Sequence, residues 1–167
     1  TQHLYYISRY DDLPQMQRDL TGDRPFSRLA TTYYIYRIYD LVNDSRFWKS
    51  YRTKSRLNKP AGTYYVAGDL GIMYVINQPG DTRFSAYKLN DVVVYGPTGK
   101  TIPNVYVAYP GGRTTDGALF ADVRFPSLSK YMDGSRSGGF IDVRGLRDII
   151  LARSADTYLI AAEAKVT

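Results

Sequence analysis

Aromatic and charged side chains are mixed near the start of the chain. Within eight positions, three tyrosines accompany one arginine and two aspartates: Tyr5, Tyr6, Arg9, Tyr10, Asp11 and Asp12. A tyrosine ring can pack on the flat face of C–H groups that a sugar ring presents, while Arg and Asp can hydrogen-bond the sugar hydroxyls. We therefore interpret this cluster as a candidate ligand-binding site. In the competing interpretation, the tyrosines anchor a loop on helices that lie outside this chain.

The sequence contains no recognisable set of catalytic residues. Hydrolysis of a glycosidic bond needs two positioned carboxyl groups, one of them with a raised pKa. The chain has 15 Asp and one Glu, but most Asp lie in turn contexts such as 22–23, 80–81 and 133–134. A Ser-His-Asp triad would have to use His3, a terminal residue that we interpret as solvated, and no G-x-S-x-G motif occurs. We expect no catalytic residues and no enzymatic activity.

The sequence also predicts no metal and no cofactor. Cysteine is absent, which removes disulfides, thiol nucleophiles and zinc–thiolate sites together. The glycine pair at 111–112 is not followed by Lys-Ser or Lys-Thr, so there is no phosphate-binding P-loop. The Asp-rich turns lack the spacing of a calcium-binding EF-hand loop.

Positive charge is concentrated in residues 46–59, which contain six Lys or Arg and no acidic residue. A basic segment flanked by aromatic residues can bind nucleic acid. However, the net charge of the whole chain is only +6, and no helix-turn-helix, RNP or zinc-finger pattern is present. We therefore expect no nucleic-acid partner and interpret this segment as the solvated face of a strand.

The composition favours a mixed α+β fold that is rich in loops and strands. Asp, Gly and Pro favour turns and loops, and the chain has 14 Gly and 8 Pro. Residues 1–28 are predicted to form a loop with short helical turns. Residues 46–54 alternate as in a strand. Further strands are predicted at 63–66, 71–76, 83–88, 92–95 and 105–109, with loops at 110–118 and 133–139.

Two segments have helical spacing. The first covers residues 31–42, with a cap at Thr31 or Thr32 and one shared face formed by Ile35, Ile38, Tyr39 and Val42. The second is a C-terminal helix over residues 153–166, whose apolar side is formed by Leu151, Ala155, Tyr158, Leu159 and Ala162. We expect this side to be buried, either against residues 33–42 or by association. No Gly or Pro stop follows, which suggests a truncated helix.

Five segments of the chain resemble motifs of the SusD/RagB family, in the order in which that family has them. The C-terminal segment RSADTYLIAAEA (153–164) is similar to the family pattern RxAExYLIxAEA, with Asp156 in place of Glu. The other four are RPFSRLATTY (24–33), similar to RPxxRxxPTxY but with Thr31 in place of Pro; DSRF (44–47), similar to DxRF; GD (68–69), similar to the start of GDTA; and FPSLSKYMD (125–133), similar to P.L.K..D.

This resemblance implies a fold and a function. Members of the family are lipoproteins of several hundred residues, with a tetratricopeptide-like α-superhelix and an irregular ligand-binding part. They sit at the Bacteroidetes outer-membrane surface over a SusC-like TonB-dependent transporter, to which they deliver glycans or, in some members, peptides. No run of this chain is long and apolar enough to span a bilayer, so the implied membrane attachment is a lipid anchor outside the chain.

The resemblance also implies that residues 1–167 form a single incomplete region of such a protein. We divide it into a loop and helix part (1–60), a strand-rich part (61–120) and a loop followed by the start of a C-terminal helical part (121–167). The alternative function is that of a glycoside hydrolase or an accessory domain of a polysaccharide-degrading enzyme.

Overall fold

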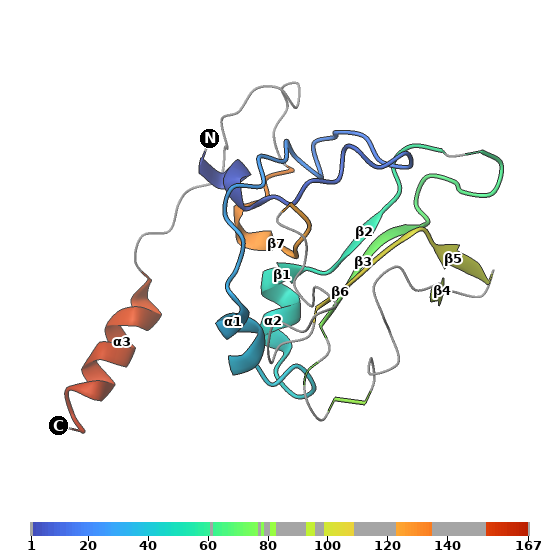
Figure 1. Cartoon of the computed structure of the whole chain (residues 1–167). Coiled ribbons are helices and arrows are strands. Elements are labelled where there is room, and N and C mark those ends of the chain that lie inside the picture. Colours follow the sequence, from blue (N-terminus) through green and yellow to red (C-terminus); the bar gives the residue numbers. More distant parts are fainter. Residues whose placement is uncertain are drawn as a thin grey trace.

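The computed structural model describes residues 2–60, 62–76, 78, 81–82, 93–95, 99–108, 123–134 and 153–166. In this part of the chain, short helices and small sheets are joined by loops, and a longer helix lies at the C-terminal end (Figure 1). The predicted mixed α+β fold with a C-terminal helix is therefore confirmed. The elements are η1 (Gln2–Tyr6), α1 (Tyr33–Ile38), α2 (Ser45–Ser50), β1 (Tyr51–Arg52), β2 (Lys54–Arg56), β3 (Leu70–Ile76), β4 (Val93–Tyr95), β5 (Lys100–Ile102), β6 (Asn104–Ala108), β7 (Ser127–Leu128), η2 (Ser129–Tyr131) and α3 (Ser154–Glu163).

Strand β3 is at the centre of the fold. All seven of its residues are buried, and it pairs with β2 in antiparallel and with β6 in parallel orientation. A strand that is covered on both faces has a nearly continuous apolar sequence, and LGIMYVI fits this pattern. The predictions of strands at 71–76, 92–95 and 105–109 are confirmed by β3, β4 and β6, within the residues that the structure describes.

Side chains of β3 contribute to three hydrophobic clusters: Ile72 and Tyr74 face one side, Met73 and Val75 face the other, and Ile76 lies at the end of the strand. The N-terminal cluster consists of Leu4, Ile7, Tyr10, Met16, Leu57, Ile72 and Tyr74. The sheet cluster consists of Leu70, Met73, Val75, Ile102 and Val105. The aromatic cluster consists of Tyr36, Leu41, Phe47, Tyr51 and Ile76. Each cluster therefore includes at least one residue of β3.

Helix α1 is shorter than predicted and buries a different residue. It ends at Ile38, because the Asp40 carboxylate then accepts the backbone N–H groups of Val42 and Asn43 at 3.0 Å and turns the chain. Ile38 and Val42 are more than half exposed, whereas Tyr36 is fully buried. The predicted face was therefore right for Ile35 and Tyr39, which are partly buried against Phe47 and its neighbours, and wrong for Ile38 and Val42, because the helix does not continue to residue 42. Thr32 does occupy the N-cap position, but its side chain makes no capping hydrogen bond.

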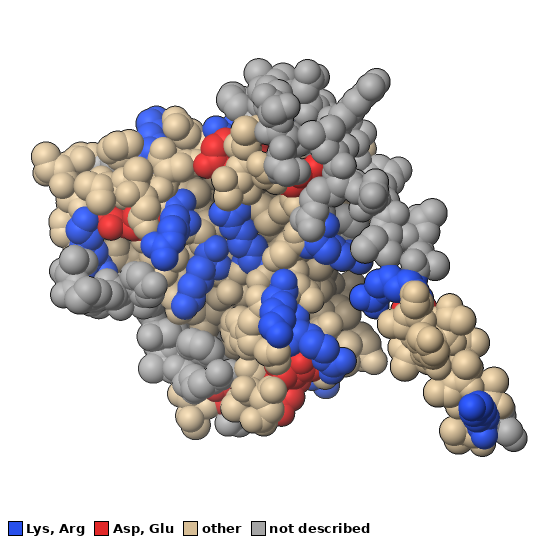
Figure 2. Space-filling model, turned by 180° about the vertical axis from the view of Figure 1, so that it is seen from behind, with Lys and Arg blue, Asp and Glu red and all other residues tan. Residues whose placement is uncertain are grey.

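The strand predicted over 46–54 was wrong for its first half, which is helix α2. The Asp44 carboxylate accepts the backbone N–H of Arg46 at 2.9 Å and caps this helix. A helical turn also brings the rings of Phe47 and Tyr51 into a stack with centroids 4.7 Å apart. The second half is extended, as predicted, in β1 and β2. Lys54 and Arg56 of β2 are exposed, and Figure 2 shows Lys and Arg side chains across one face of the molecule.

The other expected elements had mixed outcomes. Residues 62–64 form a turn, and only Tyr65 makes an isolated strand-like bridge, so the strand predicted at 63–66 was wrong. Strands β5 and β7 were not predicted. The strand predicted at 83–88, the loop at 110–118 and most of the loop at 133–139 lie outside the described residues. The division into three parts stays a prediction, although β1 and β7 pair across its first and last parts.

Helix α3 confirms the predicted C-terminal helix but not its buried face. The Asp156 carboxylate accepts the backbone N–H of Arg153 at 3.1 Å, which fixes the start of the helix. None of its residues is buried, and Tyr158 and Leu159 are 77% and 68% exposed. Figure 1 shows α3 apart from the other elements. Burial of Ala155, Tyr158, Leu159 and Ala162 against residues 33–42 was therefore predicted wrongly, burial by association stays a prediction, and Leu151 lies outside the described residues.

A pair of substitutions tests this difference between the core and α3. We expect Leu159→Asp to change the free energy of unfolding of the 167-residue chain by no more than about 0.5 kcal/mol, because the side chain is exposed. Phe47→Ala should lower it by about 3–5 kcal/mol, because Phe47 is fully buried in the aromatic cluster. Urea unfolding followed by circular dichroism measures both. A large loss in Leu159→Asp would show that α3 is packed in solution.

Candidate functional site

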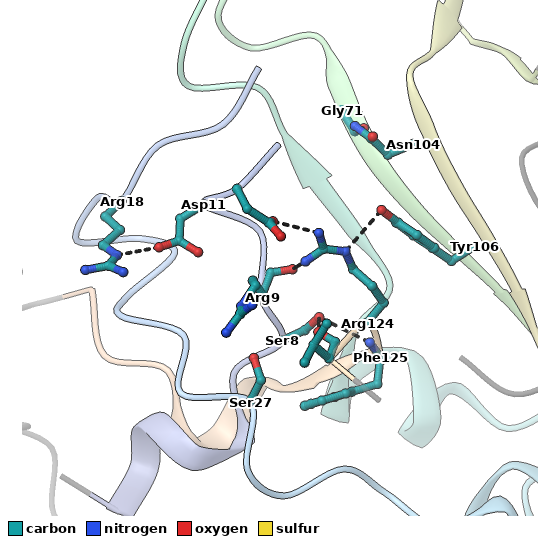
Figure 3. A network of polar contacts seen from close by, with 12 residues as sticks. Ser8, Arg9, Asp11, Arg18, Ser27, Gly71, Asn104, Tyr106, Arg124 and Phe125 are labelled. Atoms are coloured by element: carbon teal, nitrogen blue, oxygen red, sulfur yellow. Dashed lines mark hydrogen bonds and ion pairs between the residues drawn. The ribbon is translucent and has the colours of Figure 1, made fainter. Parts of the chain in front are cut away.

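The N-terminal segment that contains the candidate site is held by residues more than a hundred positions away. The backbone N–H of Arg9 donates to the carbonyl of Val123 at 2.9 Å. The buried hydroxyl of Ser8 donates to the same carbonyl at 3.0 Å and accepts the N–H of Phe125 at 3.1 Å. The backbone N–H of Ser8 in turn donates to the Ser127 hydroxyl at 3.0 Å. These contacts position residues 8–9 against the segment that leads into β7 (Figure 3).

Arg124 is the main side-chain anchor of this segment. Its guanidinium donates to the Tyr106 hydroxyl at 3.2 Å, to the Asp12 carboxylate at 2.6 Å and to the backbone carbonyl of Arg9 (Figure 3). Burial alone would lower the pKa of Arg124, but the hydrogen bond to Asp12 and the nearby Tyr106 hydroxyl outweigh it, so the pKa is raised. One cation therefore joins β6 to both ends of the 9–12 loop.

Tyr10 belongs to the core, contrary to its prediction as a ligand-binding residue. Its ring is only 7% exposed and lies in the N-terminal cluster. Its hydroxyl donates to the carbonyl of Asp23 at 2.6 Å, and a side chain at Gly22 would collide with it. The polar tip of the buried tyrosine is thus satisfied within the fold. Tyr10 thus anchors the loop, but on the core of this chain and not on helices outside it, as the competing interpretation expected.

The two predicted aspartates form ion pairs. Asp11 accepts from the Arg18 guanidinium at 2.5 Å, in a partly exposed pair. The Asp12 side chain, which Arg124 contacts, is 46% exposed, so one side of its carboxylate faces solvent. Asp11 therefore closes the 11–18 loop. Asp12 both anchors the segment and remains accessible.

Tyr5, Tyr6 and Arg9 keep some exposure. The Tyr5 side chain is 36% exposed, Tyr6 is half-buried and Arg9 is exposed. The centroid of the Tyr5 ring lies 5.8 Å from that of the Phe26 ring. The Arg24 guanidinium lies over the Phe26 ring, 5.1 Å from its centroid. The structure thus brings Tyr5, Arg24 and Phe26 together at the surface, and Arg9 is exposed further along the same segment.

Arg24 and Phe26 were not predicted as site residues. They lie in the segment 24–33, which resembles a motif of the SusD/RagB family. This resemblance is the one feature of the sequence that could have identified them as site residues. Backbone hydrogen bonds place the segment next to η1: the N–H of Phe26 donates to Leu4 at 3.2 Å, and that of Arg28 donates to Tyr5 at 2.9 Å. The aromatic pair of Tyr5 and Phe26 therefore comes from two segments whose contact cannot be predicted from the sequence alone.

Several carboxyl groups elsewhere are fixed by local hydrogen bonds. Asn43 holds the pKa of Asp40 below its usual range, Arg46 does so for Asp44, and Lys100 does so for Asp69. A general acid needs the opposite shift. Among the described residues, no group of three or more His, Cys, Asp or Glu could hold a metal ion. These aspartates cap, turn or pair.

Comparison of the chain with family models, with curated proteins and with solved structures found no match. The resemblance to the SusD/RagB family therefore rests on the five sequence segments. In the part of the chain that the structure describes, no helix has the length and apolar character needed to cross a membrane.

Removing Arg124 tests whether it anchors the candidate site. We expect Arg124→Ala to lower the free energy of unfolding by about 2–4 kcal/mol, because it leaves the Tyr106 hydroxyl, the Arg9 carbonyl and Asp12 without their donor. Arg18→Ala is the control: it breaks the partly exposed pair with Asp11 and should cost no more than about 1 kcal/mol. Urea unfolding compares the two. Equal losses would contradict a special role for Arg124.

Buried tyrosines predict a loss of stability at high pH. Burial raises the pKa of Tyr74 to about 12 and also raises that of Tyr10. Above pH 10 the tyrosine loses its proton in the unfolded state but keeps it in the folded state. Deprotonation therefore stabilises the unfolded state, and the free energy of unfolding falls. The fall should be on the order of 1.4 kcal/mol per pH unit for each tyrosine, from pH 10 towards pH 12. Urea unfolding at pH 9 to 11.5 measures this, and Tyr74→Phe should reduce the slope.

Proposed function

We propose that the chain is part of a non-catalytic nutrient-binding protein of the SusD/RagB type. Such a protein binds glycans, or peptides, at the outer-membrane surface and delivers them to a SusC-like TonB-dependent transporter. The observation that carries the proposal is the presence of five family-like segments in the family's order, at 24–33, 44–47, 68–69, 125–133 and 153–164.

The places of these segments in the fold support the proposal. Phe26 of the first segment packs on the N-terminal cluster. Asp44 and Phe47 of the second begin α2 and fill the aromatic cluster. The turn at Gly68 has a positive φ of 96°, which glycine adopts without strain. The fourth segment forms β7, which pairs with β1. The motif-like residues thus cap, turn and pack the chain.

A binding role is also supported by the surface around Tyr5. Its partly exposed ring, the neighbouring Phe26 and the guanidinium of Arg24 present flat apolar area beside hydrogen-bond donors. Arg9 and the open side of the Asp12 carboxylate add polar groups along the same segment. An aromatic ring can pack on the flat C–H face of a sugar, while neighbouring hydrogen-bond donors and acceptors bind the sugar hydroxyls. The site needs no reacting group for this task.

Ligand binding to the full-length protein tests the proposal. We expect Tyr5→Ala to weaken binding of the cognate oligosaccharide by about 1–3 kcal/mol, the usual cost of removing an aromatic contact at a binding hot spot. Tyr34→Ala is the control, because Tyr34 is an exposed tyrosine of α1 that belongs to neither candidate surface. Calorimetric titration against a panel of oligosaccharides and peptides measures the affinities.

Two results would contradict the proposal. Equal affinities in the wild type and in Tyr5→Ala would remove Tyr5 from the binding surface. Release of reducing sugar in the same mixtures, abolished by a single Asp→Asn substitution, would favour the alternative of a glycoside hydrolase. We expect no release above the blank, since the described carboxyls with shifted pKa values are shifted away from acid catalysis.

A further inference from the structure

A second surface of the molecule is strongly basic. Between Asp44 and Asp69 the sequence has six Lys or Arg and no acidic residue. Figure 2 shows Lys and Arg side chains in a band across one face of the described part, with few acidic side chains among them. The band overlies α2 and the first strands. We define the basic stripe as Lys49, Arg52, Lys54, Arg56 and Lys100.

Strand geometry places the middle of the stripe in a line. Tyr51, Thr53 and Leu57 are buried, whereas the alternating residues Arg52, Lys54 and Arg56 are partly or fully exposed. Side chains at every second position of an extended chain lie on the same side, roughly 7 Å apart. The chain passes from one sheet to another between β1 and β2 and its register shifts between Ser55 and Arg56, but the alternation of buried and exposed residues still puts these cations on the solvent side. Together with the band in Figure 2, this favours a row over a compact pocket.

Two further contacts extend the row. The Arg56 guanidinium donates to the carbonyl of Gly68 at 2.7 Å, and the Lys100 ammonium pairs with the adjacent Asp69 at 2.8 Å. One turn thus brings Lys100 of β5 to the end of β2. At the other end, Lys49 is exposed in the last turn of α2.

The two arginines of the stripe are oriented without being neutralised by these contacts. Arg52 donates to the carbonyl of Thr21 at 3.1 Å, and Arg56 donates to that of Gly68. A carbonyl fixes the guanidinium but carries no negative charge. The remaining N–H groups can take a carboxylate or sulfate in a charge-assisted pair, often with two parallel hydrogen bonds.

We propose that the basic stripe binds the carboxylate or sulfate groups of an acidic polysaccharide. This inference rests on the proposed function, because it names the class of glycan that the protein takes up. An acidic polysaccharide carries its charges at intervals along an extended chain, which matches a linear row of cations. The stripe would act together with the ring surface at Tyr5.

The aromatic residues of the same segment argue against a nucleic acid. Binding of single strands uses exposed rings on which bases stack. Here Phe47 and Tyr51 are buried, and the indole N–H of Trp48 donates to the carbonyl of Leu41 at 3.0 Å. The ring of Tyr64, at the Lys100 end, has that ammonium 5.9 Å from its centroid. The row therefore offers charge without stacking platforms in its centre.

Charge reversal in the full-length protein tests the inference. The test variant is Lys49→Glu with Lys54→Glu, and the matched control is Arg153→Glu with Lys165→Glu, two exposed cations at the α3 end of the chain that change the net charge equally. The probes are polygalacturonate, chondroitin sulfate, neutral dextran and amylose, single-stranded DNA, and phosphatidylglycerol vesicles. Affinity electrophoresis and calorimetry at low and high NaCl give the affinities, and circular dichroism checks that each variant is folded.

We expect the wild type to bind at least one acidic polysaccharide, with an affinity that falls as salt rises. The test variant should bind it about tenfold more weakly or worse, and the control should stay close to the wild type. Lys49→Gln with Lys54→Gln should give an intermediate loss.

The opposite results separate the inference from the proposed function. Equal losses in the test and control variants would overturn the stripe, as would tighter binding of DNA or vesicles than of either acidic polysaccharide. Binding of dextran or amylose alone, weakened by Tyr5→Ala, would overturn the inference and leave the proposed function standing. A protein that binds none of the glycans and none of a peptide panel would contradict both.

Discussion

The fold depends on the burial of β3 on both of its faces. Each hydrophobic cluster takes at least one side chain from this strand, so the N-terminal segment, the β5–β6 region and the α1–α2 region are organised around it. The close fit is visible at Gly71, where a side chain would collide with Leu57 of the neighbouring segment. A strand whose side chains are packed into three clusters cannot slip in register without breaking that packing. The positions of both candidate surfaces follow from it.

The ring surface at Tyr5 is built by long-range polar contacts on this core. Ser8 and Arg124 link residues 8–12 to residues 123–127, and Tyr74 of β3 shares a hydrogen bond of 2.9 Å with Ser8. Because these groups are buried or partly buried, leaving any of them without its partner is costly. Two tyrosines of the same segment, Tyr10 and Tyr5, have different roles. The first fixes the segment in the core, and the second presents its ring at the surface.

Local signals in the sequence predicted the elements that local physics determines. The apolar run at β3 and the periodic helix α3 were predicted correctly, because pattern alone specifies them. Helix α2 was missed, since Asp44 can either end one helix or cap the next, and the choice depends on packing of Phe47 in the aromatic cluster. Of the six predicted site residues, Tyr10 is core. Composition could not separate it from Tyr5, because the difference arises from contacts with Gly22 and Asp23.

The distribution of charge gives the two surfaces different characters. Around the ring surface, Asp11 and Asp12 are paired with Arg18 and Arg124, so ions there mainly fix the backbone. Along the stripe, Arg52 and Arg56 donate to backbone carbonyl groups, which orient a cation without neutralising it, and the Asp19 carboxylate acts on Arg52 only electrostatically. Like charges held in a row repel one another, and an anionic ligand relieves that repulsion. The ring surface thus offers flat apolar area to a ligand, and the stripe offers positive charge.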